Sequence, residues 1–101
     1  MAKKSALENN ARKARLAKQF AGRRARLKAI ANDMTKPVEE QFAARLKLAE
    51  LPRNSAKERQ RNRCEVSGRP RAYYGKMKMS RIAVRDLGLM GLVPGLVKSS
   101  W

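Results

Sequence analysis

The side chains with the clearest chemical use in this 101-residue chain are arginines, lysines and two tyrosines gathered between residues 53 and 85. Eleven Lys and Arg fall in this stretch, eight of them Arg, against two acidic residues. The planar guanidinium of Arg binds phosphate in bidentate fashion and stacks on bases. Tyr73 and Tyr74 lie among these cations, a mixture that suits single-stranded or looped RNA. A packing role is equally expected for one of them, because neighbouring strand residues point to opposite faces.

The residue inventory argues against catalysis and metal binding. The chain has no His and a single Cys, Cys64, so it lacks the usual general base, an internal disulfide and a zinc ligand set. Its six Gly form neither a phosphate-binding loop motif nor a dinucleotide fingerprint. We therefore expect a protein that is not an enzyme and that has no cofactor, no bound metal and no small-molecule substrate.

The net charge of +17 predicts a strongly anionic partner. Residues 1–31 carry ten basic groups and one acidic group, whereas residues 32–52 carry three basic and four acidic groups. Residues 86–101 hold one group of each sign. We interpret 1–31 and 53–85 as phosphate-contacting segments, and the near-neutral middle and tail as protein contacts or core. A short chain with this self-repulsion is expected to be marginally stable until its partner binds.

Two helices are predicted in the N-terminal half. Residues 1–31 are rich in Ala, Leu, Lys and Arg and contain no Pro, which is typical of a long helix. A second helix is expected over about 37–51, because Glu39 and Glu40 suit its start and Pro52 ends it. The first helix has a narrow apolar stripe of Leu16, Phe20, Leu27, Ile30 and Met34. The second has an apolar face of Val38, Phe42, Leu46 and Ala49. We expect these faces to pack together in an antiparallel pair.

The second half of the chain predicts a linker and a small folded module. Residues 52–63 hold one Ala and no larger apolar residue, so an extended basic linker is expected there. Turn signals and a β-like run at 72–74 predict a short hairpin. Ser80 is a good N-cap for a helix over about 81–90, which Gly91 ends. The inward face of this helix is predicted to comprise Ile82, Ala83, Leu87 and Met90.

Residues 61–101 resemble the C-terminal module of bacterial small-subunit ribosomal protein fourteen. The matching segments are RNRC, SGRPR, SRIAVR, a G-x-x-PG turn and the KSSW ending. The opening MAKKS and the LPRNS and RQRNR segments resemble the longer form of that family. The resemblance implies assembly into the head of the small ribosomal subunit, near the aminoacyl-tRNA region. It also implies small-subunit proteins three and ten as neighbours.

The short form of this family binds zinc through a C-x2-C-x12-C-x2-C pattern in the same module. Laid on this chain, the four positions are Cys64, Ser67, Ser80 and Ala83, of which the first alone is Cys. The resemblance therefore implies a zinc-ribbon-like module that has lost its metal. The longer N-terminal part and RNA contacts are expected to supply order instead.

These observations predict a mainly α, extended and irregular fold. It comprises an N-terminal basic helix and second helix over 1–51 and an extended basic linker over 52–63. A zinc-ribbon-like RNA-binding module without metal ligands, a short β-hairpin plus a helix, follows over 64–101. The candidate RNA-binding residues are Arg12, Arg15, Arg23, Arg24, Arg26, Arg53, Arg59, Arg61, Arg63, Arg69, Arg71, Tyr73, Tyr74, Lys76, Lys78, Arg81, Arg85, Lys98 and Trp101.

The predicted function, which rests on the resemblance, is that of a structural constituent of the small ribosomal subunit. The chain is expected to bind small-subunit ribosomal RNA in the head, to be needed for subunit assembly and to help shape the aminoacyl-tRNA site. It is expected in the cytoplasm, in the ribosome, with an organellar ribosome less favoured.

Three other interpretations of the sequence fit it less well. A DNA-binding or nucleoid-associated protein would need a sorted recognition face or a dimer seam, and neither is evident. A membrane-active basic helix would need a wider apolar face than the stripe between 16 and 34. A simply solvated first helix would account for its charge without any ligand.

Overall fold

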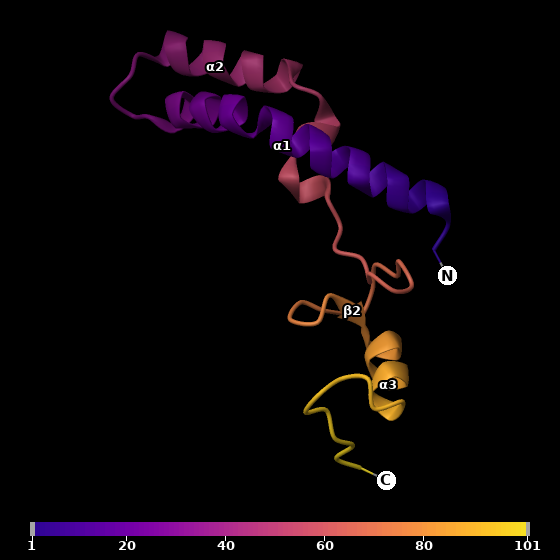
Figure 1. Cartoon of the computed structure of the whole chain (residues 1–101). Helices are drawn as coiled ribbons and strands as arrows, with labels where there is room; N and C mark the ends of the chain where they lie inside the picture. The colour runs from indigo at the N-terminus through magenta and orange to yellow at the C-terminus, as the bar shows by residue number, and fades with distance from the viewer. Residues whose placement is uncertain (1, 101) are drawn as a thin grey trace. The chain divides into compact units, whose positions relative to one another are not determined.

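The structure, a computed structural model, describes residues 2–100 and is mainly helical, as predicted. The helices are α1 (Lys4–Asn32), α2 (Val38–Glu50) and α3 (Arg81–Leu89). Two short 3₁₀ helices, η1 (Arg53–Ser55) and η2 (Lys57–Arg59), follow α2, and β1 (Tyr73–Tyr74) and β2 (Met79–Ser80) form an antiparallel hairpin. The chain divides into two compact units, residues 8–60 and residues 1–7 with 61–101. Figure 1 shows the order of the elements.

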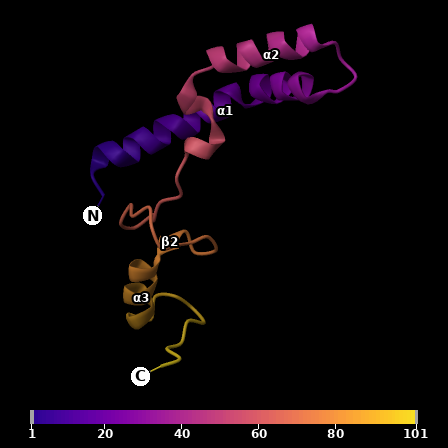
Figure 2. The same ribbon diagram turned by 180° about the vertical axis from the view of Figure 1, so that it is seen from behind.

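In the unit of residues 8–60, α2 runs back beside the C-terminal half of α1, as both Figure 1 and Figure 2 show. Side chains hold the turn between the helices. Thr35 donates from its backbone N–H and its hydroxyl to Asp33 Oδ1, at 3.1 and 2.7 Å. These two hydrogen bonds lower the pKa of the Asp33 carboxyl below its ordinary value. Gln41 Nε2 closes the turn by donating to the carbonyl oxygens of Asp33 and Lys36, at 2.8 and 3.1 Å.

The predicted antiparallel pair is confirmed, but the prediction of which face of α2 packs is wrong. Val38, Phe42 and Leu46 are 78%, 60% and 52% exposed. Ala44 is buried and Leu48 is half-buried, on a different side of the helix. The predicted stripe of α1 is half-buried from Leu16 to Ile30, and Met34, in the turn, is exposed.

Polar side chains explain the rotation of α2. Gln41 bonds the turn, and Arg45 Nη2 donates to the Ala31 carbonyl oxygen near the end of α1, at 3.5 Å. The last carbonyls of a helix have no partner within it, and Arg45 supplies a donor to one of them, which the apolar face could not do. The small Ala44 side chain fits between the helices on the same side. On this side α2 thus presents hydrogen-bond donors and a small side chain, and its larger apolar side chains face solvent.

Residues 53–59, expected to be extended, form η1 and η2. Ser55 is buried, and its hydroxyl accepts a hydrogen bond from Arg24 Nη2 of α1 at 2.8 Å. The same hydroxyl donates to the Pro52 carbonyl oxygen. The segment has almost no apolar residue, yet these polar contacts attach it to α1.

In the other unit, the hairpin leads directly into α3. Tyr73 pairs with Ser80 and Tyr74 with Met79. Ser80 caps α3 as predicted, because its Oγ accepts from the Ala83 N–H at 3.3 Å. Ala83 and the next residue, Val84, are buried in this first turn.

The predicted inward face of α3 is only partly correct. Leu87 is half-buried, but Ile82 and Met90 are 44% and 71% exposed. The helix has nine residues, and the buried ones belong to its first turn, next to the hairpin. Among residues 2–100, the buried apolar side chains of this unit are Cys64, Ala83 and Val84, which are too few to cover the rest of the helix.

The start of the chain belongs to the same unit as the hairpin. The Ala2 N–H donates to the Ser67 carbonyl oxygen at 3.2 Å. Gly68 has φ +71°, and a Cβ there would lie 2.8 Å from Leu7 Cδ2. Only glycine suits this position, since it adopts the left-handed region easily and leaves room for Leu7. The first turn of α1 is thereby held against the turn at 64–69.

Candidate nucleic-acid interface

Most of the candidate RNA-binding side chains project into solvent. Of the eighteen that the structure describes, fourteen are exposed, so a polyanion can reach them, and Arg24, Arg63, Arg69 and Tyr73 are partly buried. Trp101 lies outside the described residues. Lys78 forms an ion pair with Glu65 at 4.0 Å, with both side chains about two-thirds exposed. An exposed pair of this kind contributes little and leaves the lysine available to phosphate.

The unit of residues 8–60 contains a basic cleft between α1 and the 3₁₀ helices. Its volume is about 470 Å³. Its floor is made of alanines of α1, and its cations come from both sides: Lys18, Arg24, Lys28 and Lys57. One acidic residue, Glu58, also lines it. Small side chains let a sugar-phosphate backbone approach the helix closely, and the surrounding cations favour its charge.

Arg24 has a structural part in this cleft. Its Nη2 holds Ser55, while its Nε is buried without a hydrogen-bond partner. The guanidinium therefore fixes one wall of the cleft.

Three cations that line this cleft, Lys18, Lys28 and Lys57, belong to the predicted phosphate-contacting segments but are not among the candidate RNA-binding residues. Arg was favoured for those candidates because of the bidentate fork of the guanidinium. A signal was present in the sequence, because Ala14, Ala17, Ala21 and Ala25 recur every three or four residues on one side of α1.

The unit of residues 61–100 contains a second basic cleft, of about 530 Å³. It lies between α3, the hairpin and the C-terminal segment. The structure brings together here four of the predicted residues: Tyr74, Arg81, Arg85 and Lys98. Tyr74 is 54% exposed and Tyr73 is half-buried, so the two tyrosines face opposite ways as strand alternation predicts.

The remaining predicted residues line neither basic cleft. They are Arg12, Arg15, Arg23, Arg26, Arg53, Arg59, Arg61, Arg63, Arg69, Arg71, Tyr73, Lys76 and Lys78. Arg63 is used within the module, since its Nη1 donates to the Gly68 carbonyl oxygen at 2.9 Å. The side chain thus stabilises the turn that holds Leu7.

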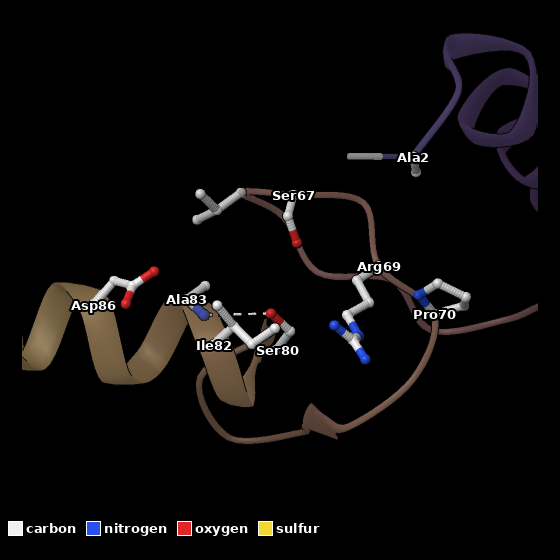
Figure 3. A pocket seen from close by; sticks show the side chains of 9 residues that line it. Ala2, Ser67, Arg69, Pro70, Ser80, Ile82, Ala83 and Asp86 are labelled. Atoms are coloured by element: carbon white, nitrogen blue, oxygen red, sulfur yellow. Dashed lines mark hydrogen bonds between the residues drawn. The ribbon is translucent and has the colours of Figure 1, made fainter.

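A third pocket, of about 430 Å³, lies over the start of α3 and is shown in Figure 3. Arg69 and Pro70 border it on one side, and Ile82 and Asp86 of α3 on the other. The Ser80 and Ala83 side chains lie between these borders, with the N-cap hydrogen bond drawn as a dashed line (Figure 3). The mixed charge of Arg69 and Asp86 makes this pocket a weaker site for a polyanion than the two clefts.

Three of the four positions that carry zinc ligands in the short family form line this pocket, and they do not suit the metal. Zinc needs four thiolate or imidazole ligands in a structural site, whereas these positions supply two hydroxyls and a methyl group besides the Cys64 thiol. Within residues 2–100, no group of three or more His, Cys, Asp or Glu side chains could hold a metal ion.

Hydrogen bonds occupy the place that ligand bonds would take. Cys64 is buried, and its Sγ accepts the Ser67 N–H at 3.4 Å. Burial raises the pKa of the thiol, but hydrogen bonds from Ser67 and Ser80, through side chain and backbone, lower it by more, to about 6. The sulfur is thus held as an anionic acceptor between two turns.

A family model and full-length relatives identify the same ribosomal protein family as similar to this chain. A family model described as ribosomal protein S14p/S29e matches residues 47–100. A small ribosomal subunit protein uS14 of Beijerinckia indica is 74% identical over the full length of both chains. Proteins with the same name from Xanthobacter autotrophicus and Azorhizobium caulinodans are 69% and 68% identical, again over both full lengths.

Among the helices of residues 2–100, none is long and apolar enough to cross a membrane.

The resemblance of residues 61–101 to the ribosomal protein family is confirmed by the family model and by the full-length relatives. On the strength of the family match and the full-length identity, the chain belongs to the ribosomal protein S14p/S29e family.

Proposed function

We propose that this chain, a small-subunit structural constituent by family, binds the ribosomal RNA of that subunit in the head. There it would be needed for subunit assembly and would help to shape the aminoacyl-tRNA site, inside ribosomes of a bacterial cytoplasm. The observation that carries the RNA-binding proposal is the pair of basic clefts, one in each compact unit. Each combines several cations with a floor of apolar side chains.

The pattern of charge supports RNA over duplex DNA as the ligand. The cations are spread around α1, along η1 and η2 and over the hairpin, and so follow no single helix face. Recognition of duplex DNA places one helix or ribbon in a groove, with its readout residues sorted to one side. Irregular folded RNA offers phosphates from several directions and unstacked bases for an exposed tyrosine.

The exposed face of α2 supports protein neighbours, for which small-subunit proteins three and ten are our candidates. Val38, Phe42 and Leu46 form an apolar stripe four residues apart, here called the α2 stripe. Glu39 and Glu50 lie at one side of this stripe in the helical wheel, and a carboxylate there repels RNA phosphates. A basic protein surface with an apolar groove suits the stripe better than RNA does.

The RNA-binding proposal is tested by removing charge from the α1 cleft. In one variant Lys18→Gln and Lys28→Gln remove two cations that line the cleft. If each lysine contributes about 0.7 kcal/mol through charge-assisted phosphate contacts, incorporation into small subunits falls about tenfold against the parent chain. The measurement is the ratio of variant to parent in gradient-purified subunits from cells that express both.

The matched control removes the same charge from the near-neutral segment, through Lys36→Gln and Lys47→Gln. This variant should incorporate nearly as well as the parent. Equal losses in the two variants would mean that diffuse net charge, and no particular surface, drives binding. Sedimentation of the tagged parent with the nucleoid instead of with small subunits would favour the DNA-binding alternative.

A further inference from the structure

The cleft between α3 and the C-terminal segment differs from the α1 cleft in its chemistry. Its lining includes three cations, Arg81, Arg85 and Lys98, and no acidic residue. It also includes an exposed aromatic side chain, Tyr74, which the α1 cleft lacks. Arg81 and Arg85 stand one helical turn apart on α3, so both guanidinium groups can face one ligand.

Glycines shape the apolar floor of this cleft. Gly91, with φ +74°, ends α3 and sends the chain back, and the Leu92 N–H donates to the Leu87 carbonyl oxygen at 2.9 Å. A Cβ on Gly88 would lie 2.5 Å from Leu96 Cδ2, so the missing side chain makes room for Leu96 on the helix. Figures 1 and 2 both show the C-terminal segment turning back beside α3. The floor is therefore built by packing within this unit.

The combination of an apolar floor, a tyrosine ring and cations narrows the class of ligand. A free phosphate or an acidic peptide would use the cations but would gain nothing from Tyr74, Met77 and Leu96. A nucleobase has an apolar face for the ring and floor, and its own phosphates for the cations. The volume of about 530 Å³ suits one nucleotide better than a duplex.

We propose that this cleft receives a single unstacked nucleotide of ribosomal RNA. The base stacks on Tyr74 and contacts Leu96 on the floor of the cleft. The flanking phosphates form ion pairs with Arg81, Arg85 and Lys98. This inference rests on the proposed function, because it names the part of the RNA that the module holds.

The test compares two eight-residue probes of equal charge with the full chain. One is octauridine, and the other is the same ribose-phosphate chain without bases. Stacking of one base on an aromatic side chain makes octauridine bind about tenfold more tightly than the abasic probe, measured by fluorescence anisotropy. The substitution Tyr74→Ala leaves the charge unchanged and should remove most of this preference, whereas Tyr74→Phe should keep it.

A matched control removes an exposed aromatic ring from the other unit through Phe42→Ala, and should leave the preference intact. A second readout uses octauridine with one 4-thiouridine, whose photo-crosslink should map to Tyr74 or Met77. The double substitution Arg81→Gln and Arg85→Gln should lower the affinity for both probes by a similar factor, because it removes phosphate contacts that the two probes share.

The outcomes separate this inference from the proposed function. If both probes bind equally, RNA binding stands and the nucleotide cleft is wrong. A preference that survives Tyr74→Ala would place the base elsewhere and overturn the assignment. If an octaglutamate peptide competes as well as octauridine, the cleft holds an acidic segment instead. If neither probe binds, the proposed function fails as well.

Discussion

At the scale of single residues, Cys64 shows how hydrogen bonds to one buried sulfur join two turns of a small module. Its buried sulfur lies between the turn at Ser67 and the cap at Ser80, and accepts hydrogen bonds from both. Ser67 and Ser80 occupy two of the positions that carry cysteine in the short, zinc-binding form. Ser67 and Ser80 thus supply hydrogen bonds to the sulfur without offering zinc a thiolate set.

The lowered pKa of Cys64 predicts a pH dependence of stability. The thiol titrates near pH 6 in the folded chain and at its ordinary value, 9.0, when unfolded. Its stabilising effect is therefore complete above pH 9 and is lost as the pH falls through 6, by at most about 1.4 kcal/mol per pH unit. We expect the free energy of unfolding to fall from pH 9 to pH 6 in urea titrations. The variant Cys64→Ser should be much less dependent on pH over this range, and an equal dependence in both chains would contradict the assignment.

At the scale of elements, one side of α2 packs within the chain and another side is left free to bind a partner. Its inward side is held by Gln41, Ala44 and Arg45, while its largest apolar side chains form the exposed α2 stripe. A helix that leaves such residues in solvent has surface to bury against another molecule. The near-neutral charge of residues 32–52 is consistent with this role.

The α2 stripe predicts a separation of stability from assembly. Phe42→Ser with Leu46→Ser should leave the free energy of unfolding of the isolated chain within about 0.5 kcal/mol, because both side chains are already exposed. The same variant should lose about tenfold in competition for incorporation into small subunits, if burial of each side chain at the contact contributes about 0.7 kcal/mol. The half-buried Leu48, replaced by Ser as a control, should reduce stability itself. Normal incorporation of the double variant would exclude the stripe as a contact.

At the scale of the whole molecule, the charge is unusually large for the amount of core. The buried apolar residues among those described are Ala17, Ala31, Ala44, Leu51, Cys64, Ala83 and Val84, mostly small side chains. A net charge of +17 works against any compact state of so small a chain. Anionic RNA relieves this repulsion, so folding and binding are expected to be coupled.

This balance predicts that salt stabilises the isolated chain while it weakens binding to RNA. Raising ionic strength from about 0.01 M to 0.15 M shortens the Debye length from about 30 to 8 Å and screens the repulsion. We expect the melting temperature of the isolated chain, followed by circular dichroism, to rise over this range. Affinity for octauridine should fall over the same range, because bound counterions are no longer released as favourably. A melting temperature that falls with salt would show that attractive ion pairs dominate.

The sequence by itself determined the elements, the charge pattern and the family. Helix composition, Pro52, the Ser80 cap and Gly91 act within a few residues of one another, and the predicted helices accordingly match α1, α2 and α3 closely. The residue types of 61–101 were specific enough to indicate the family that the comparisons confirmed.

The tertiary structure alone decided which faces pack and where cavities form. The apolar pattern of α2 favoured Phe42 as an inward residue, but Phe42 is exposed, while Gln41 bonds carbonyls of the turn and Arg45 bonds the Ala31 carbonyl of α1. The attachment of η1 depends on Arg24 reaching Ser55, 31 residues away. Both clefts likewise join residues from separate elements. Such contacts depend on long side chains meeting distant partners, and no local pattern of residues specifies them.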